Sequence, residues 1–434
     1  MSEEIVGRGA REGSRLFREW FAELAEHERR GRPIAYVFVM GSLAELLRSF
    51  DAALVFPEIN SLQTAVRRQS AGYLNQAEEM GYSPDICGYV KADVAAQTRG
   101  GEHPMGHIPK PTLAVLTTAC NTYVKWAEIW ERMYHVPVLT LDVPGTRVAG
   151  RPGAAPGSGD FARDRRYVEG QLRELVGSCE RLLGVRFDVD RLRASMAASN
   201  AMAAGFRSVL AANRARPAPF SAVTDGTVYL GVLNAFRGTL TGARYFAELA
   251  QEMEHKVERG LGTLTAEEFR LIFLGVPCYP IFRRFSDLFA ERGGAFVAST
   301  YLWFASGGTE IDFEYDLGDP LKSLAEGLLL GVGAAMDAMF FQDQAVLPLV
   351  DQYGVDGVVF HAVKSCRTTS TGMADARRAL QARRDVASLL LESDMMDPRV
   401  VSEAQLKNRI DAFFEGMAAA RLRAAVAAGE AAGG

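Results

Sequence analysis

The chain has 434 residues, of which 48% are hydrophobic and 23% are charged, and its formal net charge at neutral pH is −5. A chain of this length exceeds the usual size of one core, so two or three domains are expected. The composition is typical of globular proteins and excludes a disordered or fibrous chain. The mildly acidic balance gives no electrostatic basis for binding nucleic acid.

The first twenty residues carry charges throughout and lack the apolar segment of a secretory signal peptide. The best apolar stretch, residues 328–341, is interrupted by Asp337 and stays below the roughly 18 residues that a membrane span needs. We therefore expect a cytoplasmic protein with no membrane partner. The five cysteines are odd in number, and in a reducing compartment they are not expected to form a disulfide framework.

The first third of the chain alternates between helix and strand patterns. An amphipathic helix is predicted over residues 13–29, within an N-terminal segment 1–32. The elements predicted next are strands at 35–39, 53–56, 113–117 and 136–141, with helices at 61–80 and 122–134. Strands separated by helices indicate a parallel sheet, so residues 33–145 are predicted to form a first α/β domain.

The rest of the chain predicts a helical region and a second α/β domain. Residues 146–160 are rich in Gly, Pro and Ala and are expected to be a linker, and residues 161–260 are predicted to be helical. Over residues 261–434 the predicted elements are strands at 271–276, 295–300, 357–360 and 386–391, with helices at 281–291, 320–345, 371–383 and 402–422. The predicted fold class is therefore α/β, with two parallel-sheet units and an intervening helical region. An ancient duplication would explain the two units, but no self-similarity in the sequence proves it.

Three cysteines lie at predicted junctions between elements. Cys120 ends the segment TLAVLTTAC and precedes a helix, and Cys366 repeats this arrangement in GVVFHAVKSC. Ligands of open α/β sheets bind outside the carboxyl ends of the strands. Cys87 lies beside Gly88 at an expected helix start, where free amides and the helix dipole favour a thiolate. Spacing alone leaves two interpretations open, a shared metal site or three unrelated buried thiols, because the chain has no CxxC pair.

The other two cysteines have less distinctive surroundings. Cys179 continues an apolar stripe at helical spacing, so we expect it to be packed in the core. Cys278 follows a predicted strand in FLGVPCYPIF. It is either a fourth ligand or a residue that lines the same crevice, and the second interpretation is favoured.

Two histidines and two arginines are further candidates. His103 and His107 form an HxxxH pair, but the intervening Pro104 disfavours the helix that such a zinc site needs. His103 is a candidate catalytic proton donor, although surface exposure is the simpler interpretation. Arg283 and Arg284 follow the Cys278 loop and either meet the phosphates of coenzyme A or lie on a solvated helix face.

Acidic and glycine-rich segments give weaker indications. Glu392, Asp394 and Asp397 follow a predicted strand, and Asp397, which precedes a proline, is most simply a turn or capping residue. The segments GLGTLT at 260–265 and GVGAAM at 331–336 lack the third glycine of a dinucleotide loop, and no GK dipeptide occurs. The chain therefore has no Walker A loop, and any handling of ATP is expected in another chain.

Several segments together resemble one family over residues 33–420. They are SPDICGYVKADV, TTACNTYVKWAEIW, LGVPCYPIFRRFSDLFAERGGAFVAS, FHAVKSCRTTS and LLLESDMMDPRVVSEAQLKNRIDAFFEGM. Their order and spacing resemble the benzoyl-CoA reductase / 2-hydroxyacyl-CoA dehydratase family. The segments RGGEHPMGHIPKP and ESDMMDPR are most similar to the larger cluster-bearing subunit of the ATP-dependent reductases of this family.

The resemblance implies that Cys87, Cys120 and Cys366 hold a [4Fe–4S] cluster whose fourth iron has a non-cysteine ligand. It also implies a second related cluster subunit, an ATP-hydrolysing activator pair, ferredoxin as electron donor and an aromatic acyl-CoA substrate. The implied activity is the dearomatisation of benzoyl-CoA to a cyclic dienoyl-CoA. Two alternatives stay open: a subunit of a 2-hydroxyacyl-CoA dehydratase, and a non-catalytic electron-transfer protein of the same fold.

Overall fold

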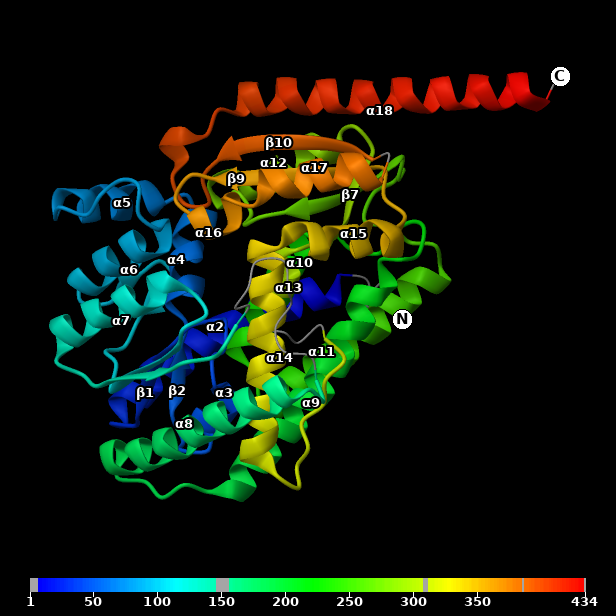
Figure 1. The fold of residues 1–434 in the computed structure, drawn as a ribbon. Helices are drawn as coiled ribbons and strands as arrows, with labels where there is room; N and C mark the ends of the chain where they lie inside the picture. Colours follow the sequence, from blue (N-terminus) through cyan, green and yellow to red (C-terminus); the bar gives the residue numbers. More distant parts are fainter. Residues whose placement is uncertain (1–6, 146–155, 307–310, 385, 433–434) are drawn as a thin grey trace.

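Two four-stranded parallel sheets organise the chain, as the computed structural model shows for residues 7–145, 156–306, 311–384 and 386–432 (Figure 1). The first sheet has the order β2-β1-β5-β6 and the second has the order β10-β9-β7-β8. All neighbouring strands within these two sheets run parallel. The strands are β1 (Ile34–Val37), β2 (Ala53–Val55), β5 (Leu113–Thr117), β6 (Val138–Leu141), β7 (Phe269–Leu274), β8 (Gly294–Ser299), β9 (Gly357–Val363) and β10 (Ala387–Ser393). The predicted α/β class is confirmed.

The two sheets share one topology. When the strands of each sheet are numbered in chain order, both sheets have the order 2-1-3-4. The strand order reverses between the first and third strands, which are β1 and β5 in one sheet and β7 and β9 in the other. That switch point is where open α/β sheets bind ligands. The shared order agrees with a duplication, whereas the exact domain boundaries stay a prediction.

The first unit also contains several helices and a small hairpin. They are α3 (Ala44–Arg48), α4 (Pro57–Val66), α5 (Ser70–Glu79), α6 (Gly88–Thr98) and α7 (Asn121–Tyr134), with a small hairpin of β3 (Glu102–His103) and β4 (Gly106–His107). Pro57 at the start of α4 has the backbone angle that a first helical residue needs. The single helix predicted over 61–80 is wrong, because Arg68 has a left-handed φ of 59° that ends one helix before the next begins.

Long helices form the region between the two sheets. They are α8 (Gly159–Leu183), α9 (Val189–Ala212), α10 (Thr224–Ala235) and α11 (Leu240–Glu258). The N-terminal helix α2 (Arg8–Arg29) packs against α10 and α11, so it joins this region. Of the predicted linker 146–160, residues 146–155 lie outside the described residues. Its end is corrected, because α8 begins at Gly159, where the Ser158 side chain accepts a hydrogen bond from the Phe161 amide.

The second unit carries a long helix that packs inside the fold. Helix α14 (Pro320–Phe340) is apolar enough in length and composition to cross a membrane, but 56% of its most apolar window is buried in the protein. It packs against α8, α13 (Tyr301–Phe304) and α15 (Gln342–Tyr353). The single helix predicted over 320–345 is therefore wrong, because the chain leaves the helical conformation at Phe341.

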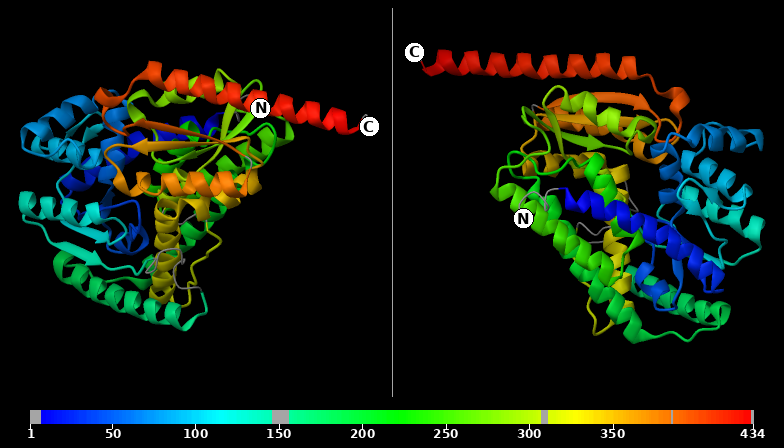
Figure 2. Two further views of the ribbon diagram at one scale, coloured as in Figure 1. Left: turned by 45° about the horizontal axis from the view of Figure 1, so that its top comes forward. Right: turned by 180° about the vertical axis from the view of Figure 1, so that it is seen from behind.

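The remaining elements complete the second unit. They are the turns η1 (Tyr279–Ile281) and η2 (Pro398–Val400) and the helices α12 (Phe282–Ala290), α16 (Arg367–Ser370), α17 (Met373–Arg383) and α18 (Glu403–Ala432). Helix α18 runs along β10 and then projects beyond the sheet (Figure 2). It is longer than the helix predicted over 402–422.

Candidate functional site

Three cysteines occupy the same structural position on three different elements. Cys87 is the N-cap of α6, Cys120 is the N-cap of α7, and Cys366 is the N-cap of the short helix α16. All three are half-buried free thiols. All three line one cavity of about 1180 Å³ that is shared by both α/β units. The structure thus brings together the three cysteines that the junction pattern singled out.

The three thiols interact with one another electrostatically. Burial raises the pKa of Cys87, and negative charge on Cys366 or Cys120 raises it further. Burial also raises the pKa of Cys120, and charge on Cys366 adds to that effect. Backbone N–H groups at the helix starts act in the opposite direction, from Val90 on Cys87 and from Thr122 on Cys120. The bare thiols of Cys87 and Cys120 therefore stay protonated, and a positively charged group beside them would release their protons.

The donor set fits an iron–sulfur cluster better than a single ion. Within the described residues, no group of three or more His, Cys, Asp or Glu side chains is close enough to hold one metal ion. A cluster of four irons and four sulfides is larger than one ion, so its thiolate ligands stand further apart. Ser365, next to Cys366, has a buried hydroxyl with no partner among the described residues, and this O–H is free to bond a sulfide. Three thiols, free amides and one free hydroxyl fit such a group.

The two units meet directly beside Cys87 and Cys366. A Cβ atom at Gly88 would lie 2.7 Å from Cβ of Met396 and 3.3 Å from Oγ of Ser365. Only glycine therefore allows α6 to begin this close to the loop after β10. The hydroxyl of Ser70 on α5 also donates to the Met396 carbonyl oxygen at 2.6 Å.

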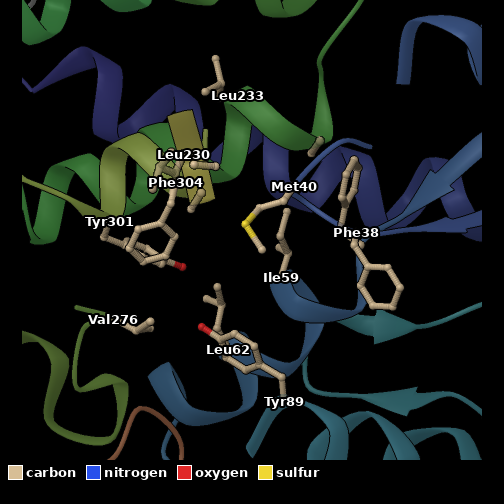
Figure 3. Close-up of a cluster of buried hydrophobic side chains, with 14 of the residues drawn as sticks. Phe38, Met40, Ile59, Leu62, Tyr89, Leu230, Leu233, Val276, Tyr301 and Phe304 are labelled. Carbon is tan, nitrogen blue, oxygen red and sulfur yellow. The ribbon is translucent and has the colours of Figure 1, made fainter. Parts of the chain in front are cut away.

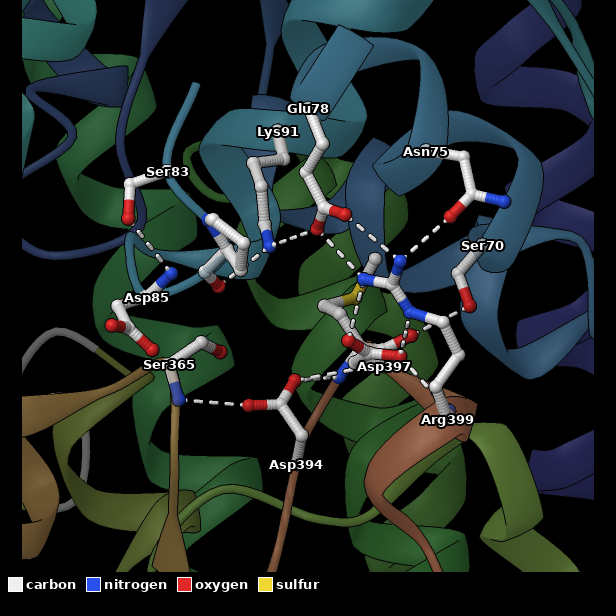
Figure 4. Close-up of polar contacts among 12 residues, drawn as sticks. Ser70, Asn75, Glu78, Ser83, Asp85, Lys91, Ser365, Asp394, Asp397 and Arg399 are labelled. Carbon is white, nitrogen blue, oxygen red and sulfur yellow. Dashed lines mark hydrogen bonds and ion pairs between the residues drawn. The ribbon is translucent and has the colours of Figure 1, made fainter. Parts of the chain in front are cut away.

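Asp394 fixes the loop that carries Cys366 (Figure 4). Its carboxylate is 1% exposed and accepts hydrogen bonds from the amides of Ser365, Met396 and Asp397 at 2.8, 2.8 and 3.0 Å. Hydrogen bonds from backbone amides to a buried carboxylate are among the stronger ones in proteins. Asp397 caps η2 by accepting from the Arg399 amide, as expected for a capping residue.

An ion-pair network ties the Cys87 loop to the second unit, as the dashed contacts in Figure 4 show. Lys91 on α6 is 1% exposed and donates to Glu78 at 2.9 Å and to the Pro84 carbonyl oxygen at 2.7 Å. Arg399 then bridges Glu78 and Asp397, at 2.7 Å to each. These pairs hold the Pro84–Cys87 segment against the loop that follows β10.

Buried hydrogen bonds join helices α6 and α7 next to the site. The buried Asp93 on α6 accepts hydrogen bonds from the indole nitrogens of Trp126 and Trp130 on α7, both at 2.7 Å. The starts of these two helices carry Cys87 and Cys120. Their fixed relation therefore sets how far apart the two thiols stand.

The interior of the cavity is largely apolar and carries one buried acid that the sequence analysis missed (Figure 3). Glu58, at the start of α4, is 5% exposed, and its Oε1 accepts from the Val39 amide at 3.3 Å. Its Oε2 has no hydrogen bond of normal geometry to the described residues, although the Tyr123 hydroxyl lies near the carboxyl group. Burial raises the pKa of Glu58 to about 7, so the group gains or loses a proton near neutral pH. Its position just after a predicted strand could have identified it.

The remaining cysteines do not join the site. Cys179 is fully buried on α8, in the core as expected. Cys278 is also 0% exposed and is not part of the cavity wall that the described residues form, so the favoured expectation that it lines the crevice is wrong. Burial raises the pKa of the Cys278 thiol to about 11, and the Ser393 side chain contacts it.

The two histidines serve separate roles. His103 is 9% exposed, so the surface exposure expected for it is wrong. Its ring stacks on Phe21, its Nε2–H donates to the Asn60 carbonyl at 2.9 Å, and its Nδ1 accepts from the Met105 amide at 3.1 Å. Burial lowers the pKa of His103 to about 4, which keeps the ring neutral, and the ring does not line the cavity. His107 instead pairs with Glu28 at 2.9 Å.

The two arginines after the Cys278 loop point in different directions. Arg283 lines the cavity at an exposed position. Arg284 pairs with Glu291 and with Glu403, and therefore lies on the solvated face of α12. The solvated helix face is thus the observed place of Arg284, whereas a contact of Arg283 with coenzyme A phosphates stays a prediction.

The chain belongs to the 2-hydroxyglutaryl-CoA dehydratase, D-component family, whose model matches residues 42–417. It is 33% identical over 397 residues to a benzoyl-CoA reductase subunit of Thauera aromatica, covering 89% of each chain. It is 25% identical over 380 residues to the (R)-phenyllactyl-CoA dehydratase alpha subunit of Clostridium sporogenes, covering 86% of this chain and 87% of that one.

A third relative belongs to the same group of enzymes. The (R)-2-hydroxyisocaproyl-CoA dehydratase alpha subunit of Clostridioides difficile is 24% identical over 419 residues, covering 93% of this chain and 94% of the relative. These matches confirm the family expected from the sequence. The chain is therefore related to enzyme subunits of acyl-CoA reductases and dehydratases, and the names of these relatives imply partner subunits.

Proposed function

We propose that this chain is the iron–sulfur subunit of an ATP-dependent, ferredoxin-driven reductase that converts benzoyl-CoA, or a substituted analogue, to a cyclic dienoyl-CoA. The observation that carries the proposal is the set of three N-capping thiols, contributed by both units, on the wall of one large apolar cavity. A [4Fe–4S] cluster held by Cys87, Cys120 and Cys366 supplies one-electron transfer at low potential when it is bound. The 33% identity to the benzoyl-CoA reductase subunit of Thauera aromatica favours the aromatic substrate.

The charges around the cavity suit a coenzyme A thioester. Six basic side chains line it, and all six are exposed: Arg18, Arg67, Lys125, Arg132, Arg283 and Arg367. The acids that line it are Glu58, which is buried, and Asp85, which is exposed. Exposed cations attract the phosphates of coenzyme A, and the apolar interior takes the acyl group.

The chain's own residues have two further tasks in this proposal. The apolar wall excludes water from the acyl group, and this suppresses the competing reduction of protons. Glu58 faces the same space with a pKa of about 7, so it can hold a proton near the reacting group at neutral pH. We assign it as the candidate that supplies or accepts a proton inside the cavity, in place of His103.

The proposal requires other chains and a reducing compartment. Reduction of the ring takes two electrons, and a cluster of this kind passes one at a time, so we propose a second related cluster subunit that faces this one across the substrate. The sequence contains no Walker A loop, so an ATP-hydrolysing activator pair would receive electrons from ferredoxin and drive them onward. Five free cysteines suit the cytoplasm.

The test is the anaerobic purification of the chain with the products of its neighbouring genes. With ATP and a strong reductant, the complex should convert benzoyl-CoA to a dienoyl-CoA, and the chain alone should bind about four iron atoms but hydrolyse no ATP. Dehydration of a 2-hydroxyacyl-CoA without any reaction on benzoyl-CoA would favour the alternative that the dehydratase relatives suggest. A cluster spectrum that no acyl-CoA changes would instead indicate an electron-transfer protein.

A further inference from the structure

Three buried tyrosines from both units meet at the cavity. Tyr89 lies on α6, two residues after Cys87, Tyr279 lies in η1, and Tyr301 begins α13. Tyr89 and Tyr301 line the cavity, and Figure 3 shows their hydroxyl groups pointing into the same space. Tyr279 is 0% exposed and stands behind them, with its hydroxyl 2.7 Å from that of Tyr301.

A count of hydrogens shows what this arrangement offers to a ligand. Each phenol has one O–H hydrogen to donate. Tyr279 donates to the oxygen of Tyr301, so the hydrogen of Tyr301 remains free. The hydroxyl of Tyr89 is buried and lies close to the hydroxyls of Tyr279 and Tyr301, toward which its hydrogen can turn, but no hydrogen bond of normal geometry joins it to the described residues. Two O–H donors, one from each unit, therefore face the cavity: the O–H of Tyr301 has no acceptor, and that of Tyr89 has only a poorly aligned contact with the other two phenols.

We propose that the hydroxyl groups of Tyr89 and Tyr301 together bind the thioester carbonyl oxygen of the acyl-CoA substrate, and that Tyr279 positions Tyr301. A carbonyl oxygen has two lone pairs and can accept both hydrogen bonds. An unpaired buried donor is costly, and this cost is relieved when such an oxygen arrives. The inference rests on the proposed function, and it holds for any acyl-CoA thioester that the family's chemistry uses.

The surroundings make these two donors effective. Both phenols are buried, and a phenol keeps its proton at neutral pH, so both can donate. Leu62, Val276 and Phe304 line the cavity around them, and hydrogen bonds are stronger in such an apolar setting. When the acyl group accepts an electron, negative charge grows on the carbonyl oxygen and both hydrogen bonds strengthen. The phenols keep their protons throughout.

The experiment compares Tyr89→Phe and Tyr301→Phe in the assembled, cluster-loaded complex. Each variant should lower kcat by about 100-fold with a much smaller change in KM, because the bond strengthens as charge develops. A second readout needs no turnover: with carbonyl-labelled acyl-CoA bound to the oxidised complex, infrared spectroscopy should show the C=O stretch at higher frequency in each variant. Tyr279→Phe should give a smaller shift in the same direction, since it acts only through Tyr301.

A matched control is Tyr353→Phe, which removes a buried phenol that donates to the Leu210 carbonyl oxygen at 3.0 Å, away from the cavity wall. It should leave the C=O frequency and kcat unchanged, and iron content checks that each variant is intact. Wild-type turnover and C=O frequency in both Tyr89→Phe and Tyr301→Phe would overturn the inference while the proposed function stands. A wild-type complex that binds no acyl-CoA would instead overturn the proposed function itself, and this inference with it.

Discussion

The two α/β units share a strand order but contribute differently to the site. In each unit a cysteine follows the third strand by three residues and caps the next helix: Cys120 after β5, which ends at Thr117, and Cys366 after β9, which ends at Val363. Cys87 has no such counterpart, because it caps α6, which belongs to the helices that follow β2 in the first unit. The shared strand order thus explains the positions of Cys120 and Cys366. The position of Cys87 depends on the extra helices that follow β2 in the first unit.

Serine in place of Cys120 or Cys366 tests the equivalence of the two units with the largest expected effect. Each substitution removes one thiolate ligand, so the chain should lose most of its iron and the complex nearly all activity. Iron analysis and visible absorbance measure the loss. Cys278→Ser, which follows the first strand of the second unit, should keep its iron. Full iron retention in Cys120→Ser would show that the proposed ligand set is wrong.

A substitution of Asp394 tests how the second unit holds the loop that carries Cys366. Asp394→Ala leaves three backbone amides without their acceptor, so the free energy of unfolding should fall by about 3 kcal/mol. Chemical denaturation measures this change. Glu392→Ala alters an exposed acid on β10, two residues before Asp394, and should stay within about 0.5 kcal/mol of wild type. Equal stabilities for the two variants would show that Asp394 does not stabilise the loop that carries Cys366.

A buried histidine in each unit gives a pH dependence of stability with the same sign. The pKa of His103 is about 4 in the folded chain, below its usual value of 6.5, so the unfolded chain binds the extra proton. Stability is therefore lost as pH falls below about 6.5, by about 2 kcal/mol between pH 7 and pH 5. Denaturation of His103→Gln at both pH values should show a loss smaller by that amount.

The second unit provides the counterpart of this experiment. His361 is 0% exposed, and its ring nitrogens contact the Val276 carbonyl oxygen and the Ser393 hydroxyl, both at 2.6 Å. Burial lowers the pKa of His361 as well, so His361→Gln should weaken the pH dependence with the same sign. An identical loss of stability in wild type and in both variants would exclude the histidines as its source.

The smallest expected effect is a change in the KM for acyl-CoA that distinguishes Arg283 from its neighbour Arg284. Arg283 lines the cavity, so Arg283→Ala should raise the KM for acyl-CoA about fivefold, and more at low salt. Arg284 is already paired with Glu291 and Glu403 on the helix surface, so Arg284→Ala should leave KM unchanged. Steady-state kinetics at two salt concentrations measure the difference. The same KM in both variants would argue against a phosphate contact at Arg283.

Local patterns were sufficient to predict the strands. The run Leu113–Thr117 was predicted with its observed ends, and the other sheet strands were found within three residues, because continuous apolar runs mark buried parallel strands. Helix breaks were missed at Arg68 and Phe341, where no proline or glycine interrupts the pattern. At Arg68 a non-glycine residue adopts a left-handed φ of 59°, and local propensity does not predict such a conformation.

The site was only partly readable from the sequence. Cys87, Cys120 and Cys366 stood out because each lies at a junction between elements, but their meeting depends on how the two units dock, and no local pattern encodes that contact. The burial of His103 beneath Phe21 and the burial of Glu58 also depend on elements distant in the chain. For the same reason Cys278 was misplaced, since its side chain is fully buried although Val276 of the same loop lines the cavity.

The division of the three thiols between the units has a further thermodynamic consequence. About 280 residues separate Cys87 from Cys366, so any group that binds both closes a very long loop of the chain. Such a closure restricts the unfolded chain as a disulfide does, and for a loop of this length the entropic stabilisation is about 5 kcal/mol. A group bound at the site would therefore cross-link the two units. Its loss would lower the free energy of unfolding of regions far from the cavity.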